Sequence, residues 1–323
     1  MSQSVDVVVV TYNSATTIGP LLDSLPAAAG RLSCFTVVVD NASTDSTCDV
    51  VNGRDDARLA PAPNDGYASG LNRGVAALGG SGPILMLNPD CLLEPGCIER
   101  LVDTQVATGA GIVVPVILDE DGRVARSLRR DPSLLRSIGF GHSRWAALSE
   151  AVTDDASYQH RHPVAWATGA LMLVSRECYD ALDGLDESFF MYSEETDLCL
   201  RARDLGYRTY VEPQARAMHI GGASGQSPEL YAMQALNRVR LYRRRHRLPS
   251  SIAFYLLTTA RELAWSLRRD PEARRAFEAL TRPSRRPRQL PWRGSVLRQS
   301  TPQRIAVSGA KIRTRSSRKP SSS

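Results

Sequence analysis

The chain has 323 residues, of which 42% are hydrophobic and 23% are charged, a balance that is typical of a globular protein and excludes a disordered or fibrous one. This length suffices for one large α/β domain with an appendage, or for two domains. The net charge of +6 makes nucleic acid and anionic membrane surfaces the candidate partners of its basic segments.

Apolar runs typical of strands alternate with helical patterns in the first third of the chain. The predicted strands span residues 5–13, 35–43 and 83–90, and the predicted helices span residues 16–30, 44–53 and 66–78. Such alternation predicts an α/β fold with a Rossmann-like, doubly wound and mostly parallel sheet.

Polar residues close each of these three strands. In such sheets ligands bind outside the carboxyl ends of the strands, so we expect the polar residues to share one site. They are Thr11, Tyr12 and Asn13 after the first strand, Asp40 and Asn41 after the second, and Asn88 and Asp90 after the third.

The middle of the chain mixes strands and helices. Residues 109–130 are typical of two strands around an Asp-Gly turn, and the "DEDG" there lacks the spaced ligands of an EF-hand calcium loop. Later, a strand at Leu171–Ser175 precedes a helix and the aromatic segment "SFFMY". Ser193 then opens a further helix, and a strand at 207–213 leads to His219.

The last third of the chain, from about Pro228, is rich in arginine. The run "RVRLYRRRHR" (238–247) holds six arginines, and such blocks are usually solvated or attach to polyanions. Residues 251–269 predict an amphipathic helix that lies on a membrane or packs on the rest of the protein. The twelve Lys and Arg residues after Ala279, without any acid, predict a disordered tail.

Cysteine spacing and apolar content bear on location. The six cysteines form no C-x-x-C pair and no zinc-like pattern, which favours free thiols in a reducing compartment. The N-terminal segment lacks the features of a signal peptide, and no apolar run approaches the roughly 20 residues that span a bilayer. We expect a cytoplasmic protein, with peripheral attachment to the inner face of the cell membrane as an alternative.

Five segments, in this order, resemble the inverting GT-A glycosyltransferases of family 2. The sequences around "LNPD" and at residues 167–198 are similar to those of the rhamnosyltransferase branch of this family. That branch includes actinobacterial enzymes that add L-rhamnose to N-acetylglucosaminyl-diphospho-polyprenol. The segments are "VVVVTYNS" (7–14), "VVVDNASTDST" (37–47), "NDGYASGLNRG" (64–74), "LMLNPD" (85–90) and "FFMYSEETDLCLRARDLGYR" (189–208), followed by His219.

The resemblance implies a divalent metal, Mn²⁺ or Mg²⁺, that stabilises the departing nucleotide diphosphate. Asp90 occupies a carboxylate position of the family's D-x-D motif and is expected to bind the metal, while Asn88 replaces the other carboxylate without its charge. His219 stands where a histidine completes the metal shell in related enzymes, although a hydrogen-bonded structural histidine is an equal alternative.

The resemblance also assigns the nucleotide-sugar pocket. An Asx turn is the alternative for Asp40 and Asn41, and a solvated helix arginine is the alternative for Arg73. Gly66 is expected to permit close backbone approach. The residues assigned to the donor are Thr11, Tyr12, Asn13, Asp40, Asn41, Gly66, Asn72, Arg73 and Asn88.

Inversion requires a base for the acceptor hydroxyl, which typically contributes about 10²–10⁴-fold to the rate. The resemblance places Glu195 at the base position, where the family usually has Asp, and Asp197 is the alternative. Acidic residues at a helix N-terminus are also favourable without any catalytic role. The acceptor cleft is assigned to Trp166, Thr168, Gly169 and Glu194.

These assignments divide the chain into a GT-A glycosyltransferase domain (1–227), a basic amphipathic helical extension (228–280) and a disordered basic tail (281–323). We expect a metal-dependent inverting glycosyltransferase of cell-wall or polysaccharide synthesis, with dTDP-L-rhamnose as the leading donor. The expected acceptor is a polyprenyl diphosphate-linked sugar or another glycan, and an anionic membrane surface is a further candidate partner. The sequence does not indicate an oligomeric state.

Three alternatives remain. The first is an enzyme of the same family with a UDP- or GDP-sugar donor and a soluble acceptor. The second is a sugar nucleotidyltransferase, which would need a basic glycine-rich loop after the first strand, where this chain reads "TYNSATT". The third is a nucleic-acid-binding protein, which is disfavoured because the basic residues lie outside the patterned core and form no recognised module.

Overall fold

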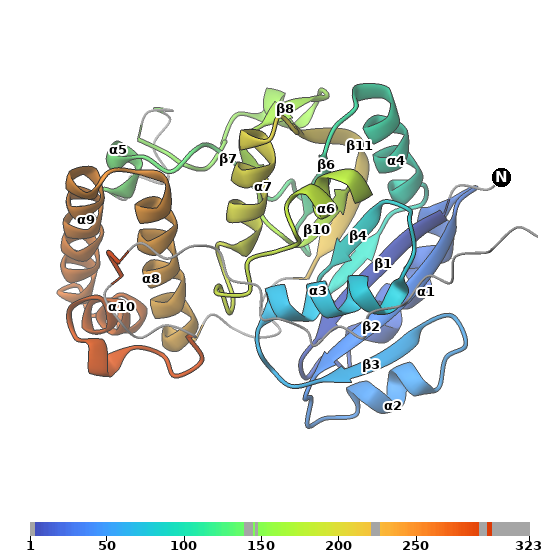
Figure 1. The fold of residues 1–323 in the computed structure, drawn as a ribbon, viewed down its shortest axis with the longest axis horizontal. Coiled ribbons are helices and arrows are strands. Elements are labelled where there is room, and N and C mark those ends of the chain that lie inside the picture. Colours follow the sequence, from blue (N-terminus) through green and yellow to red (C-terminus); the bar gives the residue numbers. More distant parts are fainter. Residues whose placement is uncertain (1–3, 139–144, 146–147, 221–226, 291–295, 299–323) are drawn as a thin grey trace, which may run out of the picture.

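The central feature is a twisted sheet covered by helices (Figure 1). The computed structural model describes residues 4–138, 145, 148–220, 227–290 and 296–298. Within these residues, eight strands follow one another across the sheet and a ninth, β8 (His162–Val164), pairs with β11. The order is β3 (Arg58–Ala62), β2 (Ser33–Asn41), β1 (Ser4–Thr11), β4 (Ile84–Leu87), β10 (Leu171–Val174), β6 (Ile112–Leu118), β11 (Thr209–His219) and β5 (Cys91–Leu93).

The sheet is mostly parallel, as the sequence predicts. β3, β2, β1 and β4 pair in parallel, as do β6 and β11. β10 enters antiparallel between β4 and β6, and β5 and β8 run antiparallel to β11. A separate ribbon joins β7 (Leu128–Arg129) to β9 (Trp166–Ala167). The predicted α/β class is therefore confirmed.

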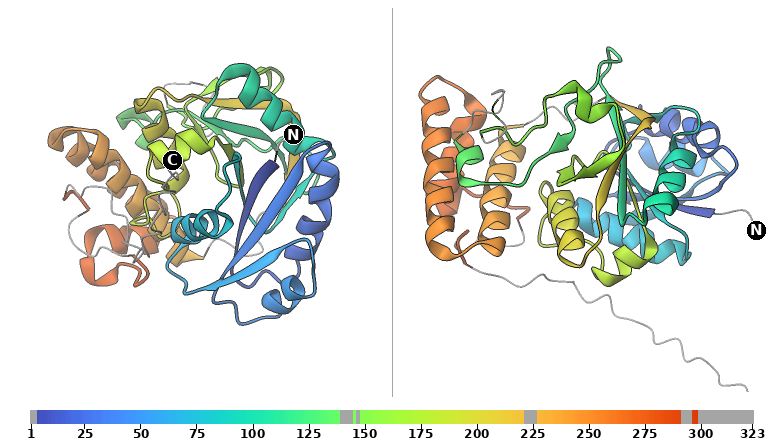
Figure 2. Two further views of the ribbon diagram at one scale, coloured as in Figure 1. Left: turned by 45° about the vertical axis from the view of Figure 1, so that its right-hand side comes forward. Right: turned by 90° about the horizontal axis from the view of Figure 1, so that it is seen from above.

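Helices cover both faces of the sheet (Figure 2). Successive side chains of a strand point to opposite faces, and in these strands both sets are apolar and need to be buried. Val5, Val7 and Val9 of β1 pack with α1 (Ile18–Ala29) and α4 (Cys97–Thr108). Val8 and Val10 pack on the other face, with α3 (Tyr67–Leu78), α6 (Arg176–Ala181) and α7 (Glu194–Asp204). The short α2 (Thr47–Asn52) adds Val51 to the first face.

Glycines let α3 approach the sheet closely. A Cβ on Gly74 would lie 2.3 Å from Cγ1 of Val8, and a Cβ on Gly70 would lie 2.8 Å from Cγ1 of Val10. Larger side chains would lift α3 off β1, and the loop before α3 would move with it.

A helical extension forms its own core beside the sheet domain. It contains α8 (Pro228–Arg245), α9 (Leu248–Ser266) and α10 (Pro271–Thr281), and the short turn η2 (Pro283–Arg285) follows (Figure 1). The short α5 (Leu134–Ser137) adds Leu134, while η1 (Asp155–Tyr158) belongs to the sheet domain. The described helices include none with the length and apolar composition needed to cross a membrane.

Two expectations for the basic segments need correction. Leu290 and Val296 are buried in the extension's core, so the described part of the region after residue 281 is packed, and residues 299–323 lie outside the described range. The arginine run of α8 is not a solvated block: Arg240 is 5% exposed, and Arg244 forms an ion pair with the buried Asp186. These arginines fasten α8 to the sheet domain.

Candidate active site

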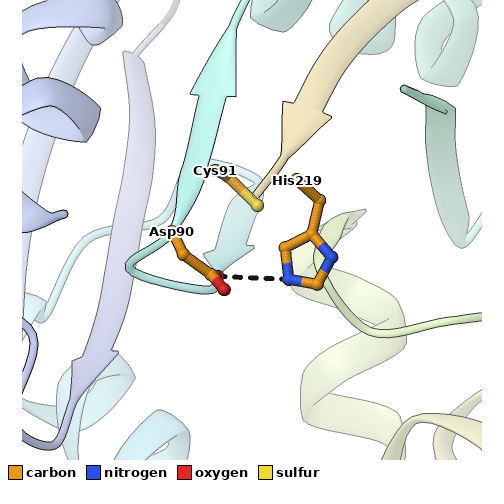
Figure 3. Close-up of side chains that lie close together, drawn as sticks. All are labelled: Asp90, Cys91 and His219. Carbon is orange, nitrogen blue, oxygen red and sulfur yellow. Dashed lines mark ion pairs between the residues drawn. The ribbon is translucent and has the colours of Figure 1, made fainter. Parts of the chain in front are cut away.

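Two strand ends bring Asp90 and His219 together (Figure 3). β5 pairs antiparallel with the end of β11, and this register sets Cys91 opposite His219. Nε2 of His219 lies 3.1 Å from Oδ1 of Asp90 and 3.3 Å from the amide nitrogen of Asn88. The sequence places His219 after a strand, whereas in the structure it is the last residue of an eleven-residue strand.

This pair fits a divalent cation. An octahedral ion with ligands at about 2.1 Å separates adjacent ligands by about 3 Å, close to the spacing of the Asp90 and His219 atoms. Both side chains are partly exposed, at 16% and 27%, which leaves room for donor phosphates and water as further ligands. A carboxylate oxygen and an imidazole nitrogen are ligands that Mn²⁺ accepts.

Cys91 also lies within this cluster, but its chemistry differs. Its thiol donates a hydrogen bond to the carbonyl of Ala170 at 3.3 Å, and burial raises its pKa well above the ordinary value. A neutral thiol is a poor ligand for a hard cation. The residues that would hold the metal are therefore Asp90 and His219, with Asn88 beside them.

The loops after β1 and β2 are tied to each other at the same sheet edge. Asp40 is buried and accepts hydrogen bonds from Oγ1 of Thr11 at 2.9 Å and from the backbone and hydroxyl of Ser43 at 2.9 and 2.5 Å. Oδ1 of Asn13 accepts from the backbone of Thr44 at 2.8 Å. Asp40 thus makes the turn that its sequence allows, and Tyr12, 56% exposed, is accessible to a ligand.

Gly66 and Arg73, both assigned to the donor, make contacts within the fold, and their role toward a donor stays a prediction. Gly66 has φ +105° and a Cβ there would lie 2.3 Å from the carbonyl oxygen of Phe190, so it seats the segment before α7. Arg73 forms an ion pair with Asp65 at 2.5 Å.

The amide of Asn72 uses all of its hydrogen-bonding capacity within the protein. Its nitrogen donates to the carbonyl of Leu185 and to Glu187, both at 2.9 Å, and its oxygen accepts from Tyr179 at 2.8 Å and from the backbone of Leu185 at 3.0 Å. Asn72 would therefore have to give up one of these hydrogen bonds to contact a donor. Asn41, the last residue of β2, donates to the carbonyl of Gly66 at 3.2 Å.

The acidic residues at the start of α7 differ in their surroundings. Burial raises the pKa of Glu195, and burial followed by the charge of Glu195 raises the pKa of Glu194 well above the ordinary value. Oε2 of each has no hydrogen-bond partner among the described residues. Asp197 instead faces Arg201 at 2.6 Å and Arg244 at 3.8 Å. Of the two candidate bases, Glu195 alone has an unengaged oxygen, because Asp197 is held by arginines.

The Asp90–His219 pair and Glu195 lie on either side of one loop, residues 168–170. The backbone of Asn88 donates to the carbonyl of Ala170 at 2.9 Å, and a Cβ on Gly169 would lie 3.1 Å from Cβ of Glu195. The buried hydroxyl of Tyr67 is within electrostatic reach of both groups, since burial, then the charges of Glu194, Glu195 and Asp90, raise its pKa. The structure therefore brings the expected metal ligand and the expected base to one side of the sheet.

The residues assigned to the acceptor surround Glu195 in different ways. Trp166 lines the same cavity as Glu195, and its indole donates to the carbonyl of Arg130 at 3.0 Å. The backbone of Thr168 donates to Ser127 at 3.0 Å and so fixes the loop. Glu194 is buried at 6% exposed and does not line that cavity.

Comparison with known proteins decides the family. A family model described as glycosyltransferase-like family 2 matches residues 3–241. This chain belongs to glycosyltransferase family 2. An N-acetylglucosaminyl-diphospho-decaprenol L-rhamnosyltransferase of Mycobacterium tuberculosis is 31% identical over 239 residues, which are 68% of this chain and 76% of the relative. The rhamnosyltransferase WbbL of Escherichia coli is 39% identical over 149 residues, 45% of this chain and 54% of that protein.

Solved structures show that the fold of this family 2 glycosyltransferase is GT-A, as predicted. GalNAc-T7 with UDP, GalNAc and Mn²⁺ superposes with a TM-score of 0.56 at 16% identity, covering 75% of this chain and 48% of that chain. The mannosyltransferase PcManGT from Pyrobaculum calidifontis, in complex with GDP-Man and Mn²⁺, gives 0.53 at 20% identity, covering 87% and 76%. The family match extends into α8, so the domain boundary at residue 227 stays a prediction.

In this glycosyltransferase the helical extension holds the loop that presents Glu195. Tyr192 and Ser193 have φ angles of +67° and +77°, which are unfavourable for residues with a side chain. The amide of Asn237, on α8, donates to the carbonyls of Met191 at 2.9 Å and of Tyr192 at 3.2 Å. Sequence reasoning misses Asn237, because nothing local marks a contact 45 residues away in the chain.

We expect Asn237→Leu to lower kcat by about 10–100-fold, because the carbonyls of Met191 and Tyr192 lose their donor and the strained turn before Glu195 relaxes. Steady-state kinetics should show an unchanged KM for the donor, since the amide of Asn237 donates to Met191 and Tyr192 and not to the Asp90–His219 pair. Asn237→Gln, which keeps the amide, should recover part of the rate. A rise in the donor KM with an unchanged kcat would contradict this positioning role.

Proposed function

We propose that this glycosyltransferase transfers L-rhamnose from dTDP-L-rhamnose, with inversion, to a hydroxyl of a polyprenyl diphosphate-linked sugar. The observation that carries the proposal is the position of Glu195 across the 168–170 loop from the Asp90–His219 pair. The 31% identity to the mycobacterial rhamnosyltransferase supports this donor and acceptor. Mn²⁺ in the structures of GalNAc-T7 and PcManGT supports a divalent metal.

Each side chain has one task in this reaction. Asp90 and His219 would hold the cation, which when bound supplies positive charge to the leaving diphosphate. Glu195 receives the proton of the acceptor hydroxyl on Oε2. The hydroxyl oxygen forms a bond to the anomeric carbon from the face opposite the donor diphosphate, and the bond to that diphosphate breaks with its electron pair. Attack from the opposite face inverts the anomeric configuration.

A donor screen tests this proposal. Purified protein is incubated with dTDP-L-rhamnose, UDP-sugars or GDP-mannose, each with Mn²⁺, Mg²⁺ or EDTA, and with a short-chain prenyl-diphospho-N-acetylglucosamine acceptor. We expect metal-dependent product from dTDP-L-rhamnose, with inverted anomeric configuration by NMR. Product from a UDP- or GDP-sugar and a soluble acceptor would support the alternative within the family. That alternative is included because the structures of GalNAc-T7 and PcManGT contain UDP and GDP-Man, respectively.

We further propose that the enzyme works at an anionic membrane surface, and α9 supplies the argument. Its side toward the protein carries Ser251, Phe254, Thr258 and Glu262, all at most 1% exposed. Its outer side is apolar instead, an inversion of the usual helix pattern. Exposed fractions on this outer face are Leu248 46%, Ile252 39%, Leu256 57%, Leu263 40% and Leu267 77%.

Charge on the rim of this outer face matches an anionic bilayer rather than a neutral partner. Arg247 precedes the row, and Arg268 and Arg269 follow it, all exposed. Arg268 lies over the ring of Trp265, 4.9 Å from its centroid, and such aromatic and basic pairs suit the lipid headgroup region. An apolar row with arginines at both ends is typical of an interfacial helix.

We expect the double variant Leu256→Glu/Leu263→Glu to bind anionic vesicles at least about tenfold more weakly, because two leucines lose their apolar burial. Co-sedimentation with phosphatidylglycerol vesicles measures the loss, and Val106→Glu, at a residue 70% exposed on α4, is the matched control. Equal binding of both variants would rule out this face. A wild-type dimer in light scattering, dissociated by the double variant, would instead assign the face to a second copy.

A further inference from the structure

A cavity of about 340 Å³ lies beside Glu195, between the sheet domain and the helical extension. Trp166, Tyr192 and Glu195 form one wall, and residues of α8 and α9 form the other. Asp90 and His219 do not line it. Glu195 therefore lines a cavity whose lining does not include the metal pair, which lies across the 168–170 loop.

Arginines dominate the polar wall of this cavity: Arg129, Arg136, Arg238 and Arg261 line it, against the carboxylates of Glu150 and Glu195. Arg238 forms an ion pair with Glu150, and Nε of Arg261 donates to Glu262, behind the wall, at 2.8 Å. After these pairings the arginines retain an excess of positive charge.

Arg129, the last residue of β7, has donors to spare. It forms no ion pair with any of the residues that the structure describes, and its guanidinium lies over the ring of Trp166, 5.9 Å from the centroid. Its Nη1 donates to backbone carbonyls, including that of Leu128 at 3.1 Å. Nε and Nη2 have no hydrogen-bond partner within the described chain, and its charge reaches Glu195.

Burial makes this positive charge costly without an anion. Burial lowers the pKa of Arg129 and of Arg238, which means that their charged forms are destabilised where they stand. Nε of Arg238 is buried with no hydrogen-bond partner. An anion with several acceptor oxygens would offset both costs.

We propose that this cavity binds the diphosphate of the lipid-linked acceptor, so that the arginines hold the acceptor while Glu195 faces its sugar hydroxyl. The inference rests on the proposed function, which requires such an acceptor. A diphosphate with two substituents keeps one negative charge on each phosphate, and guanidinium groups bind such oxygens in pairs. Trp265, 44% exposed, lines the cavity and lies on α9, so a prenyl chain that leaves the cavity meets the face proposed for the membrane.

Two acceptors that differ only in the diphosphate test this site. One is farnesyl-diphospho-N-acetylglucosamine, and the other is farnesyl N-acetylglucosaminide, in which the lipid is joined directly to the sugar. We expect Arg129→Gln to raise the KM of the first acceptor about 10–100-fold and to leave the KM of the second and of the donor unchanged. Arg261→Gln is the second variant, and Arg274→Gln, 74% exposed on α10, is the matched control. Equal effects on the two acceptors, or none, would overturn the site.

Binding of inorganic pyrophosphate separates this site from the donor site. In EDTA, we expect pyrophosphate to raise the Tm of the wild type and of Asp90→Asn, but not of Arg129→Gln. Stabilisation lost in Asp90→Asn and kept in Arg129→Gln would place the anion at the donor site and overturn the inference. A wild type that binds pyrophosphate through Arg129 but uses no diphosphate acceptor would overturn the proposed acceptor and keep the anion site.

Discussion

Asp90→Asn is expected to lower kcat/KM for transfer by about 10³-fold or more, which is the scale of removing one group that stabilises developing negative charge. Asp90 contributes the one carboxylate of the pair, because Asn88 replaces the other acid of the D-x-D motif and His219 is formally neutral as a ligand. With asparagine at position 90 the site would offer only neutral ligands. A divalent cation would then be held by the donor phosphates alone.

Isothermal titration with Mn²⁺ and dTDP should resolve this effect. We expect Mn²⁺ to bind the wild type weakly by itself and more tightly with dTDP, and Asp90→Asn to lose this coupling. His219→Ala should weaken Mn²⁺ binding by about tenfold or more while keeping part of the coupling between Mn²⁺ and dTDP.

Asn88→Asp is the informative partner variant. It restores a second carboxylate next to His219, 3.3 Å from the native amide, and is expected to tighten Mn²⁺ binding in the absence of nucleotide. Undiminished transfer by Asp90→Asn in EDTA would show that the reaction does not use the cation at this pair.

Local patterns suffice to predict the parts of this fold that are built from short segments. The valine runs of β1 and β2 and the "ILML" of β4 are strands because they are buried on both faces, and their polar ends mark one edge of the sheet. Those ends supply Thr11, Asp40 and Asp90, which the structure brings to that edge. The edge strand β3 (Arg58–Ala62), by contrast, holds a proline and no β-branched or aromatic residue, so no local pattern indicates it.

Contacts between distant segments are the part that sequence reasoning cannot supply. The antiparallel entry of β10 depends on its neighbours rather than on its own residues. The arginine run of α8 reads as a solvated block, yet the buried Arg240 donates to the carbonyl of Ser188 at 2.7 Å. Packing of α8 against the segment before α7 buries these arginines. No residue of that segment indicates the contact in the sequence.

The preference for Glu195 over Asp197 as the proposed base comes from the structure and not from the sequence. Both acids lie in the first turn of α7, where a negative charge interacts favourably with the helix dipole whether or not it is catalytic. The ion pairs with Arg201 and Arg244 occupy the oxygens of Asp197, whereas Oε2 of Glu195 has no partner among the described residues and Glu195 lines the cavity. Burial raises the pKa of Asp197 as well, but its carboxylate would have to break an ion pair with an arginine to accept a proton.

Glu195→Gln should therefore lower kcat by about 10²–10⁴-fold while donor and metal binding persist. Glutamine keeps the shape of the side chain and removes its ability to accept the proton. Glu194→Gln is the neighbouring control: burial and the charge of Glu195 raise the pKa of Glu194 well above the ordinary value, so an amide there resembles its protonated form. Glu194→Gln should remain at least ten times more active than Glu195→Gln, and the reverse order would move the base to Glu194.

The pH profile provides an independent reading of the same residue. Burial raises the pKa of Glu195, so its carboxylate form, the form that accepts a proton, is lost at a higher pH than for a glutamate in water, which titrates near ~4.3. As pH falls through the raised pKa, kcat/KM should fall about tenfold per pH unit, and Glu195→Gln should abolish this acidic limb. An acidic limb that survives in Glu195→Gln but disappears in Asp197→Asn would assign the proton transfer to Asp197, since the base is the group whose removal flattens the profile.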